Sequence, residues 1–305
     1  MPQISICIPV YNFFIEPLIS KLSHEISINS VDAEIVVIDD ASHTSFENVN
    51  HALTQKYRMN YIQLQQNAGR SAIRNLFLMY VRSPLLLFLD CDVMPGSNKF
   101  ISTYLSAAKN RMVVCGGISY ADKPPGSKNK LHWKYGRTRE ALPAIKRNQK
   151  SHRRFLTSNF LIHKKIFETI SFKDLKGYGY EDTLYGIELQ RHNIKIEHID
   201  LPAQHLKIDN AEEFVLKTEN ALINLHRLHQ SDEYASTLKR YIRLINANNI
   251  VRTFRLTWVA LLMNVRFGKT IRRSLLQGNT NLALLDLYKL LFFISLGKEQ
   301  RIRQY

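Results

Sequence analysis

Apolar runs of strand length alternate with helical segments along residues 1–120, and this alternation constrains the fold more than any other feature of the sequence. The runs span residues 4–10, 33–40, 60–67, 84–93 and 112–120. They are almost continuously apolar, as expected for strands that are buried on both faces. Helical periodicity follows several of them, first over residues 15–27. The pattern predicts an α/β fold with a mostly parallel central sheet and helices on both faces.

Polar side chains gather where these predicted strands end. They are Asp39, Asp40, Asn67, Arg70, Asp90 and Asp92. In open, mostly parallel sheets, ligands bind at the carboxyl ends of the strands. We therefore expect a ligand site at this edge of the sheet.

The pair Asp90 and Asp92, separated by Cys91, directly follows the apolar segment "LLLFL". At a strand terminus the backbone turns, so one carboxylate can face a ribose and the other a hard divalent cation, whose ligand shell a diphosphate can complete. A solvated acidic loop is the alternative. The buried strand immediately before the pair favours the metal-binding interpretation.

Three more candidates occur between residues 177 and 205. Glu181 and Asp182 follow a turn containing Gly177 and Gly179, which would allow close approach of backbone and substrate. The acids are either helix N-terminal residues or include a general base at the floor of a cleft. His205 is either a packed structural residue or a further metal ligand through its neutral imidazole.

A basic group precedes these candidates and consists of Lys146, Arg147, Lys150, Arg153 and Arg154. Such a group can cover a diphosphate and stabilise its charge. A solvated loop is the alternative, and we favour it for most of these residues.

Charge distribution separates the C-terminal segment from the rest of the chain. The formal net charge is +16, and residues 239–305 carry 13 Lys and Arg against 2 Asp and Glu. We expect one domain over residues 1–238 and a basic, amphipathic helical segment over 239–305. This segment either docks on an anionic membrane surface or packs as a small helical domain with solvated charges. Its most apolar stretch, residues 281–297, contains Asp286 and Lys289, so we expect no membrane span.

The cysteines and the N-terminus favour a cytoplasmic protein. The three cysteines are odd in number and lie in apolar runs, as expected for reduced, buried thiols. The first strand begins almost at the initiating Met, without a basic leader, so we expect no secretory signal. With the basic C-terminal segment, the sequence predicts a cytoplasmic location, with peripheral docking at the inner face of the cell membrane as one alternative.

Five motifs, taken in order, resemble the inverting family 2 glycosyltransferases of the GT-A fold. They are "IPVYN" (8–12), "VVIDDAS" (36–42), "NAGRSAIRN" (67–75), "LFLDCDV" (87–93) and "GYGYEDTLYGIEL" (177–189). The resemblance covers about residues 3–210. The "DCD" motif with the later His205 is most similar to chondroitin-polymerase-type members, whose acidic motif and histidine bind manganese.

The resemblance implies a donor site made of Pro9, Tyr11, Asp39, Asp40, Asn67, Arg70 and Asp90. In that site, Pro9 and Tyr11 would border the base. Asp40, or Asp39, would contact uracil or its ribose, and Arg70 would lie over the base. Asp90 would face the ribose and the donor sugar.

The resemblance also implies the catalytic groups. Asp92 and His205 would hold Mn²⁺ or Mg²⁺ on the diphosphate. Asp182 would deprotonate the acceptor hydroxyl, and Glu181 would contact donor or acceptor. The "QxxRW" motif of many members is absent from this sequence, which argues for single transfer and against a processive, membrane-spanning synthase.

We therefore expect a nucleotide-sugar-dependent hexosyltransferase that moves a sugar from UDP to a glycan or lipid-linked acceptor in polysaccharide or glycan synthesis. A catalytically inactive sugar-binding relative is one alternative. A nucleotidyltransferase is another, although "VYNFFIEP" after the first strand lacks the usual Gly-rich basic loop. We expect no nucleic-acid binding, because the basic charge lies outside the motif-bearing region.

Overall fold

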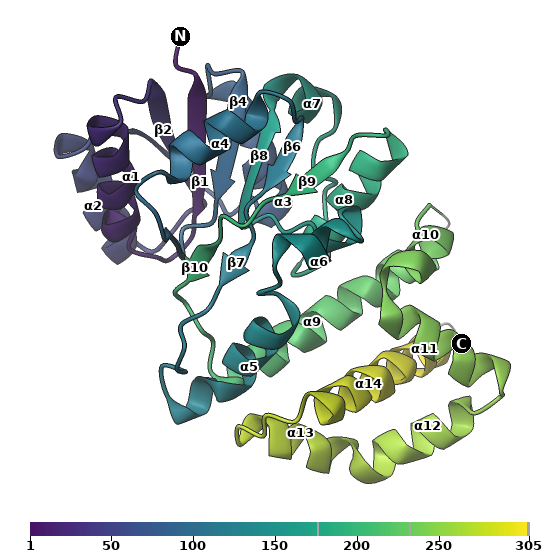
Figure 1. Ribbon diagram of the computed structural model, residues 1–305. Helices are drawn as coiled ribbons and strands as arrows, with labels where there is room; N and C mark the ends of the chain where they lie inside the picture. The colour runs from purple at the N-terminus through teal and green to yellow at the C-terminus, as the bar shows by residue number, and fades with distance from the viewer. Residues whose placement is uncertain (176, 232, 304–305) are drawn as a thin grey trace. The chain divides into compact units, whose positions relative to one another are not determined.

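The computed structural model describes residues 1–175, 177–231 and 233–303, which form two compact units (Figure 1). The first unit contains residues 1–121, 137–175 and 181–207. The second contains the described residues within 122–136, 176–180 and 208–305. All residues predicted to form the functional site belong to the first unit.

The first unit contains two sheets. The strands of the larger sheet are β1 (Ile4–Val10), β2 (Ala33–Asp39), β3 (Asn60–Gln63), β4 (Leu85–Leu89), β6 (Val113–Cys115), β8 (Asn159–His163) and β9 (Ile196–His198). They lie in the order β3-β2-β1-β4-β8-β6-β9, and only β8 runs antiparallel to its neighbours. The smaller sheet has the order β5-β10-β7, with β5 (Val93–Pro95), β10 (Ala203–His205) and β7 (Ile118–Ser119). The mostly parallel central sheet predicted from the sequence is confirmed.

Helices connect these strands and cover both faces of the larger sheet (Figure 1). They are α1 (Glu16–Ile28), α2 (Thr44–Ala52), α3 (Arg70–Leu76), α4 (Phe100–Ala108), α6 (Ala144–Asn148), α7 (Lys164–Thr169) and α8 (Glu181–Arg191). Short turns of 3-10 helix occur at Leu53–Gln55, Phe77–Met79, Ser127–Asn129 and His152–Arg154. Pro17 near the start of α1 suits its first turn, where a missing N–H costs nothing.

Alternate residues of each central strand pack on opposite faces of the sheet. Ile4, Ile6 and Ile8 of β1 join a core formed with α1 and α4. Cys7, between them, belongs to a second core that includes Phe77, Phe167 and Tyr185. Both faces therefore require apolar side chains, which explains why the sequence runs are continuous and not alternating.

Two predicted strands are shorter in the structure, and each difference has a local cause. The strand expected over residues 60–67 ends at Gln63, which pairs with Asp39, the last residue of β2. The strand expected over 112–120 is interrupted between β6 and β7 by Gly116 and Gly117, and Gly117 has a φ of 84°. A Cβ at Gly116 would lie 2.4 Å from the Leu201 carbonyl oxygen, so a side chain cannot be accommodated there.

The second unit is helical. It contains α9 (Ala211–Gln230), α10 (Ala235–Tyr241), α11 (Arg243–Thr253), α12 (Thr257–Met263), α13 (Lys269–Leu276), α14 (Leu282–Arg303) and the start of α5 (Lys130–Arg139). A π-helical turn, η5 (Asn264–Gly268), joins α12 to α13. Asn210 and Glu213 form a reciprocal capping box that fixes the start of α9.

The helices of this unit share one core. It contains Phe214 and Val215 of α9, Ile271 and Leu275 of α13, and Leu285, Tyr288, Leu291 and Ile294 of α14. Glu219 of α9 lies in a polar network with the Arg272 guanidinium, 2.7 Å away, and the Tyr288 hydroxyl. Because α9 packs with α13 and α14, the division falls near residue 208, and the boundary expected after residue 238 lies inside this unit.

Within the described residues, no helix is long and apolar enough to cross a membrane.

Candidate functional site

Asp39 and Asp40 hold together the loops at the ends of β1, β2 and β3. The fully buried Asp39 carboxylate accepts hydrogen bonds from the Ser42 N–H (2.7 Å) and the Tyr61 hydroxyl (2.6 Å). The Ser42 hydroxyl in turn accepts one from the Asn12 N–H (2.8 Å), just beyond β1. Asp39, which the sequence predicted as a donor-binding residue, therefore supports the loops at this edge of the sheet.

Asp40 determines where α3 begins. Its Oδ1 accepts a hydrogen bond from Ala68 N (2.6 Å) and its Oδ2 one from Gly69 N (3.1 Å). The Asn67 side chain donates to the Asp40 carbonyl (3.1 Å). Burial raises the pKa of Asp40, while the two N–H groups act in the opposite direction. This clasp places Gly69 at a φ of 84° and presents Arg70 as the first residue of α3.

Two arginines project from one face of α3, because residues four apart on a helix are neighbours. The Arg70 guanidinium is half-exposed and lies 3.4 Å from Glu181 Oε1. Arg74 is buried, donating to the Arg70 carbonyl (2.7 Å) and contacting Asp90 Oδ1 at 2.6 Å. Arg74 was not among the residues singled out from the sequence. Its spacing from Arg70 within "NAGRSAIRN" was the available signal.

Asp92 and His205 are brought together by the pairing of β5 and β10. His205 is opposite Val93 in this antiparallel pair, and the Leu206 N–H donates to the Asp92 carbonyl (2.8 Å). His205 Nε2 then lies 3.9 Å from Asp92 Oδ2. The Tyr120 ring stacks on the His205 ring at 5.6 Å between centroids, which fixes the imidazole plane.

The Asp92–His205 pair fits one divalent cation as a partial ligand set. Two ligands that are each about 2.0–2.2 Å from one ion lie roughly 3–4 Å apart, a range that includes the observed separation. Among the described residues, no group of three or more His, Cys, Asp or Glu side chains forms a metal site. Other oxygens would have to complete the shell.

Glu181 and Asp182 occupy the first turn of α8. Glu181 is buried beside Arg70, whereas Asp182 is partly exposed and its Oδ1 accepts a hydrogen bond from Thr183 N (2.7 Å). The pKa of Asp182 is raised to about 7, first by removal from water and then by the adjacent Glu181 carboxylate. Asp182 is thus a carboxyl group that exchanges its proton near neutral pH.

Pro9 and Tyr11 lie at the carboxyl end of β1. Pro9 is half-buried in the strand, and the Tyr11 ring beyond it is 50% exposed. The next residue, Asn12, has a φ of 49°, and its side chain accepts a hydrogen bond from His43 N (2.8 Å). The loop is therefore fixed from both sides, and the Tyr11 ring presents an exposed aromatic surface.

Arg147 has a structural role, so neither the solvated-loop interpretation of the basic group 146–154 nor diphosphate binding applies to this residue. Its buried guanidinium donates to the carbonyls of Cys115, Gly116, Leu142 and Ile199 at 2.7–3.1 Å. It also lies 2.7 Å from His198 Nδ1. The N–H groups of this guanidinium are therefore used in hydrogen bonds to backbone carbonyls of the protein itself.

Gly177 and Gly179 make room for α9 inside the second unit. Their φ angles are 94° and 91°. A Cβ at Gly179 would meet Ala221 Cβ at 2.7 Å, and one at Gly177 would meet Asn224 Nδ2 at 3.0 Å. Packing on α9 thus accounts for the close approach that the sequence suggested for substrate.

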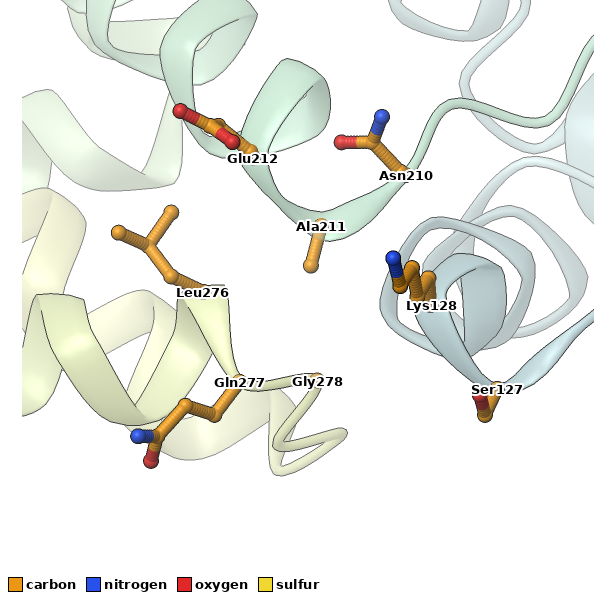
Figure 2. Close-up of a pocket in the computed structure, with 8 residues that line it drawn as sticks. All are labelled: Ser127, Lys128, Asn210, Ala211, Glu212, Leu276, Gln277 and Gly278. Atoms are coloured by element: carbon orange, nitrogen blue, oxygen red, sulfur yellow. The ribbon is translucent and has the colours of Figure 1, made fainter.

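A cavity of about 390 Å³ in the second unit is lined by residues 127–128, 210–212 and 276–278 (Figure 2). Figure 2 shows that the start of α9 forms one wall. None of the predicted site residues lines it.

Comparison with known proteins gives a consistent result at the level of family and fold. The profile of the family described as "Glycosyl transferase family 2" matches residues 5–171. An uncharacterized glycosyltransferase of Haemophilus influenzae is 24% identical over 203 residues, which are 65% of this chain and 77% of that protein.

Solved structures match over most of the chain. The mannosyltransferase PcManGT from Pyrobaculum calidifontis, in complex with GDP-Man and Mn²⁺, has a TM-score of 0.55 at 14% identity, covering 96% of this chain and 85% of that one. S. aureus TarS 1-349 in complex with UDP-GlcNAc has a TM-score of 0.50 at 14% identity, covering 98% and 92%. Glucosyl-3-phosphoglycerate synthase from Mycobacterium tuberculosis, in complex with Mg²⁺ and UDP, has 0.50 at 14% identity, covering 74% and 79%.

We expect Arg74→Met to lower the free energy of unfolding by about 2–4 kcal/mol, because it leaves the Asp90 carboxylate without its buried cation. The double variant Arg74→Met/Asp90→Asn should lose at least about 1 kcal/mol less than the sum of the single variants. Urea denaturation followed by circular dichroism measures both quantities. Strict additivity would show that the two side chains do not form a coupled pair in solution.

Proposed function

Because this chain belongs to glycosyl transferase family 2, we propose that it transfers a hexosyl group from a UDP-sugar, with inversion, to the hydroxyl of a glycan or lipid-linked acceptor. The GT-A fold and the enzyme class expected from the sequence motifs are confirmed. The closer likeness to chondroitin-polymerase-type members stays a prediction. One observation carries the proposal: acidic groups cluster around the two arginines of α3. Arg74 contacts Asp90 at 2.6 Å, Arg70 lies 3.4 Å from Glu181, which adjoins Asp182, and the charges of Asp90, Arg70 and His205 all act on Asp92.

The loops that Asp39 and Asp40 hold in place, at the ends of β1, β2 and β3, would recognise the donor. The exposed Tyr11 ring would border the base beside Pro9, and Arg70 would lie over it from α3. A carboxylate oxygen can accept more than one hydrogen bond, so Asp40 can still receive the imide N–H of uracil. The complexes of TarS with UDP-GlcNAc and of the mycobacterial synthase with UDP support uracil as the base. The GDP-Man complex makes guanine the alternative to be tested.

Asp92 and His205 would hold the divalent cation, which when bound neutralises charge on the diphosphate of the donor. Asp90 would contact the ribose and the donor sugar, and Arg74 keeps that carboxylate in place through the 2.6 Å contact. Asn67 remains a predicted donor contact whose side chain already supports the Asp40 clasp. These residues bind and orient the donor.

Asp182 would be the general base. A sugar hydroxyl is a poor nucleophile near neutral pH, so its proton must pass to a carboxylate as the new bond forms. The acceptor oxygen bonds to the anomeric carbon while the bond from that carbon to the diphosphate oxygen breaks. The electron pair leaves with UDP, and the proton moves to Asp182. Attack from the face opposite the diphosphate inverts the anomeric centre without a covalent enzyme intermediate.

Glu181 would position the reacting sugars. Its buried carboxylate faces the Arg70 guanidinium at 3.4 Å, so the first turn of α8 is connected to the start of α3. From this place it would contact donor or acceptor. The Glu181 carboxylate also raises the pKa of Asp182, which makes the Asp182 carboxylate a stronger base. A cytoplasmic location and a role in polysaccharide or glycan synthesis stay predictions.

We expect the protein to release UDP from at least one member of a panel of UDP-hexoses when Mn²⁺ or Mg²⁺ is present. In excess chelator we expect no UDP release. GDP-mannose and UDP alone are the controls for base preference and for background. Full turnover in chelator would contradict the metal assignment. Pyrophosphate release from UTP and a sugar phosphate, without UDP formation, would indicate a nucleotidyltransferase. Donor binding with no turnover for any acceptor would indicate an inactive relative.

We expect Asp182→Asn to reduce transfer by about 10²–10⁴-fold while UDP affinity stays nearly unchanged, because the base acts on the acceptor. Steady-state kinetics and calorimetric UDP binding separate the two effects. Glu188→Gln, which neutralises another carboxylate of α8, is the control and should remain active. If Asp182→Asn transferred normally and Glu181→Gln lost transfer activity, Glu181 would be the general base and Asp182 the positioning residue.

The pH dependence should report the raised pKa of Asp182. Below about pH 7 the carboxyl group is protonated, so kcat/KM should fall about tenfold for each pH unit. Stability should change in the same pH range. Ionising Asp182 in the folded protein lowers the free energy of unfolding, and this loss is complete once the pH has risen through about 7. Asp182→Asn should therefore unfold at an equal or higher temperature than wild type at pH 8. An acidic limb near pH 4, the usual carboxyl range, would contradict this assignment.

A further inference from the structure

The helical run formed by α12, η5 and α13 in the second unit has two apolar faces, of which only one is packed. On the inner face, Ala260, Ile271 and Leu275 belong to the core shared with α9 and α14. This accounts for part of the apolar stretch 256–265. The other apolar stretch, residues 282–296, lies in α14, where Leu285, Leu291 and Ile294 are buried. The helices therefore pack as a unit without burying all of their apolar side chains.

On the outer face, a stripe of large apolar side chains is left exposed. Trp258 is 67% exposed, Leu262 60% and Val265 79%. Their spacing of four and three residues puts them on one side of the helical run. Phe254 (69% exposed) precedes α12, and Phe267 (50%) is two residues after Val265, so neither belongs to this side of the run. Single exposed apolar residues are ordinary, but three large ones on one side of a helical run indicate an interaction surface.

Basic side chains surround this stripe. Arg266 and Lys269 continue the run past Val265, and Arg255 precedes it; all three are exposed. No Asp or Glu occurs between Glu233 and Asp286. The apolar stripe thus lies in a region of purely positive formal charge.

We propose that this outer face, formed by Trp258, Leu262 and Val265 with Arg255, Arg266 and Lys269, docks on a bilayer that contains anionic lipids. The helical run lies in the plane of the surface. Its apolar side chains enter the boundary between head groups and acyl chains, and its basic side chains contact lipid phosphates. The docking surface is therefore narrower than the whole segment 239–305, since α14 contributes to the core.

The charge pattern favours a lipid surface, and not a second copy of this chain, as the partner of this face. A two-fold dimer through this face would place the same basic residues opposite one another, with no acid in the segment to compensate. A bilayer provides negative charge and an apolar layer at the same time. Tryptophan suits the bilayer interface, because its ring is apolar while its indole N–H can remain in contact with water.

Flotation of the full chain with vesicles tests the proposal. We expect binding to phosphatidylcholine mixed with phosphatidylglycerol, weak binding to phosphatidylcholine alone, and release as salt shortens the Debye length. Trp258→Ser/Val265→Ser should lower the partition coefficient about tenfold or more. Arg266→Glu/Lys269→Glu should lower it about 30-fold or more.

Matched variants in the first unit are the controls. Arg58→Glu/Arg82→Glu makes the same charge change at exposed positions, and Met79→Ser removes a 72% exposed apolar side chain. Both should bind like wild type. Trp258 fluorescence should shift to the blue on anionic vesicles, and Trp258→Phe should lose that shift while still binding.

Three results would overturn the proposal. The first is equal, salt-insensitive behaviour with neutral and anionic vesicles. The second is equal weakening of vesicle binding by the outer-face and first-unit charge reversals, which would reflect net charge and not this surface. The third concerns a protein partner. Concentration-dependent self-association without lipid, lost in Trp258→Ser/Val265→Ser, would assign the face to a dimer instead. Donor hydrolysis in solution is measured in parallel, and its loss or retention tests the catalytic site separately.

Discussion

Burying charge at the end of a parallel sheet is costly, and the architecture of the first unit depends on how that cost is met. Arg74 and Asp90 illustrate the solution: a guanidinium on α3 meets the carboxylate that follows β4 at 2.6 Å. Asp39 and Asp40 are compensated differently, by hydroxyl and backbone N–H donors of neighbouring loops. A buried carboxylate without such partners would destabilise the fold by several kcal/mol. The polar residues that follow different strands are therefore tied into one scaffold.

The residues that we propose as general base and cation ligands have different environments from these carboxylates. The partly exposed Asp182 is poorly solvated and lies next to Glu181, and both effects raise its pKa to about 7. His205 Nε2 and Asp92 Oδ2 lie 3.9 Å apart, a separation that one cation bound to both atoms, as we propose, could span.

The sequence predicted the central sheet well because its signal is local: strands buried on both faces must be continuously apolar, as in β1, β2 and β4. It also predicted the polar strand ends, since chain order places them at one sheet edge. It did not predict contacts made across the fold. The buried role of Arg147, the packing of Gly177 and Gly179 on α9, and the α9-centred second unit all depend on residues distant in sequence. Arg74 shows the same limit, because its partner follows a different strand.

The central claim is that this sheet edge binds a nucleoside diphosphate through a cation held by Asp92 and His205. Calorimetric titration of UDP with and without Mn²⁺ tests it most directly, using wild type, Asp92→Ala, His205→Ala and, as a control of equal chemistry, His163→Ala. The account predicts that Mn²⁺ strengthens UDP binding to wild type and His163→Ala, and that this gain is largely lost in both site variants. Undiminished, Mn²⁺-dependent UDP affinity in Asp92→Ala and His205→Ala would contradict it.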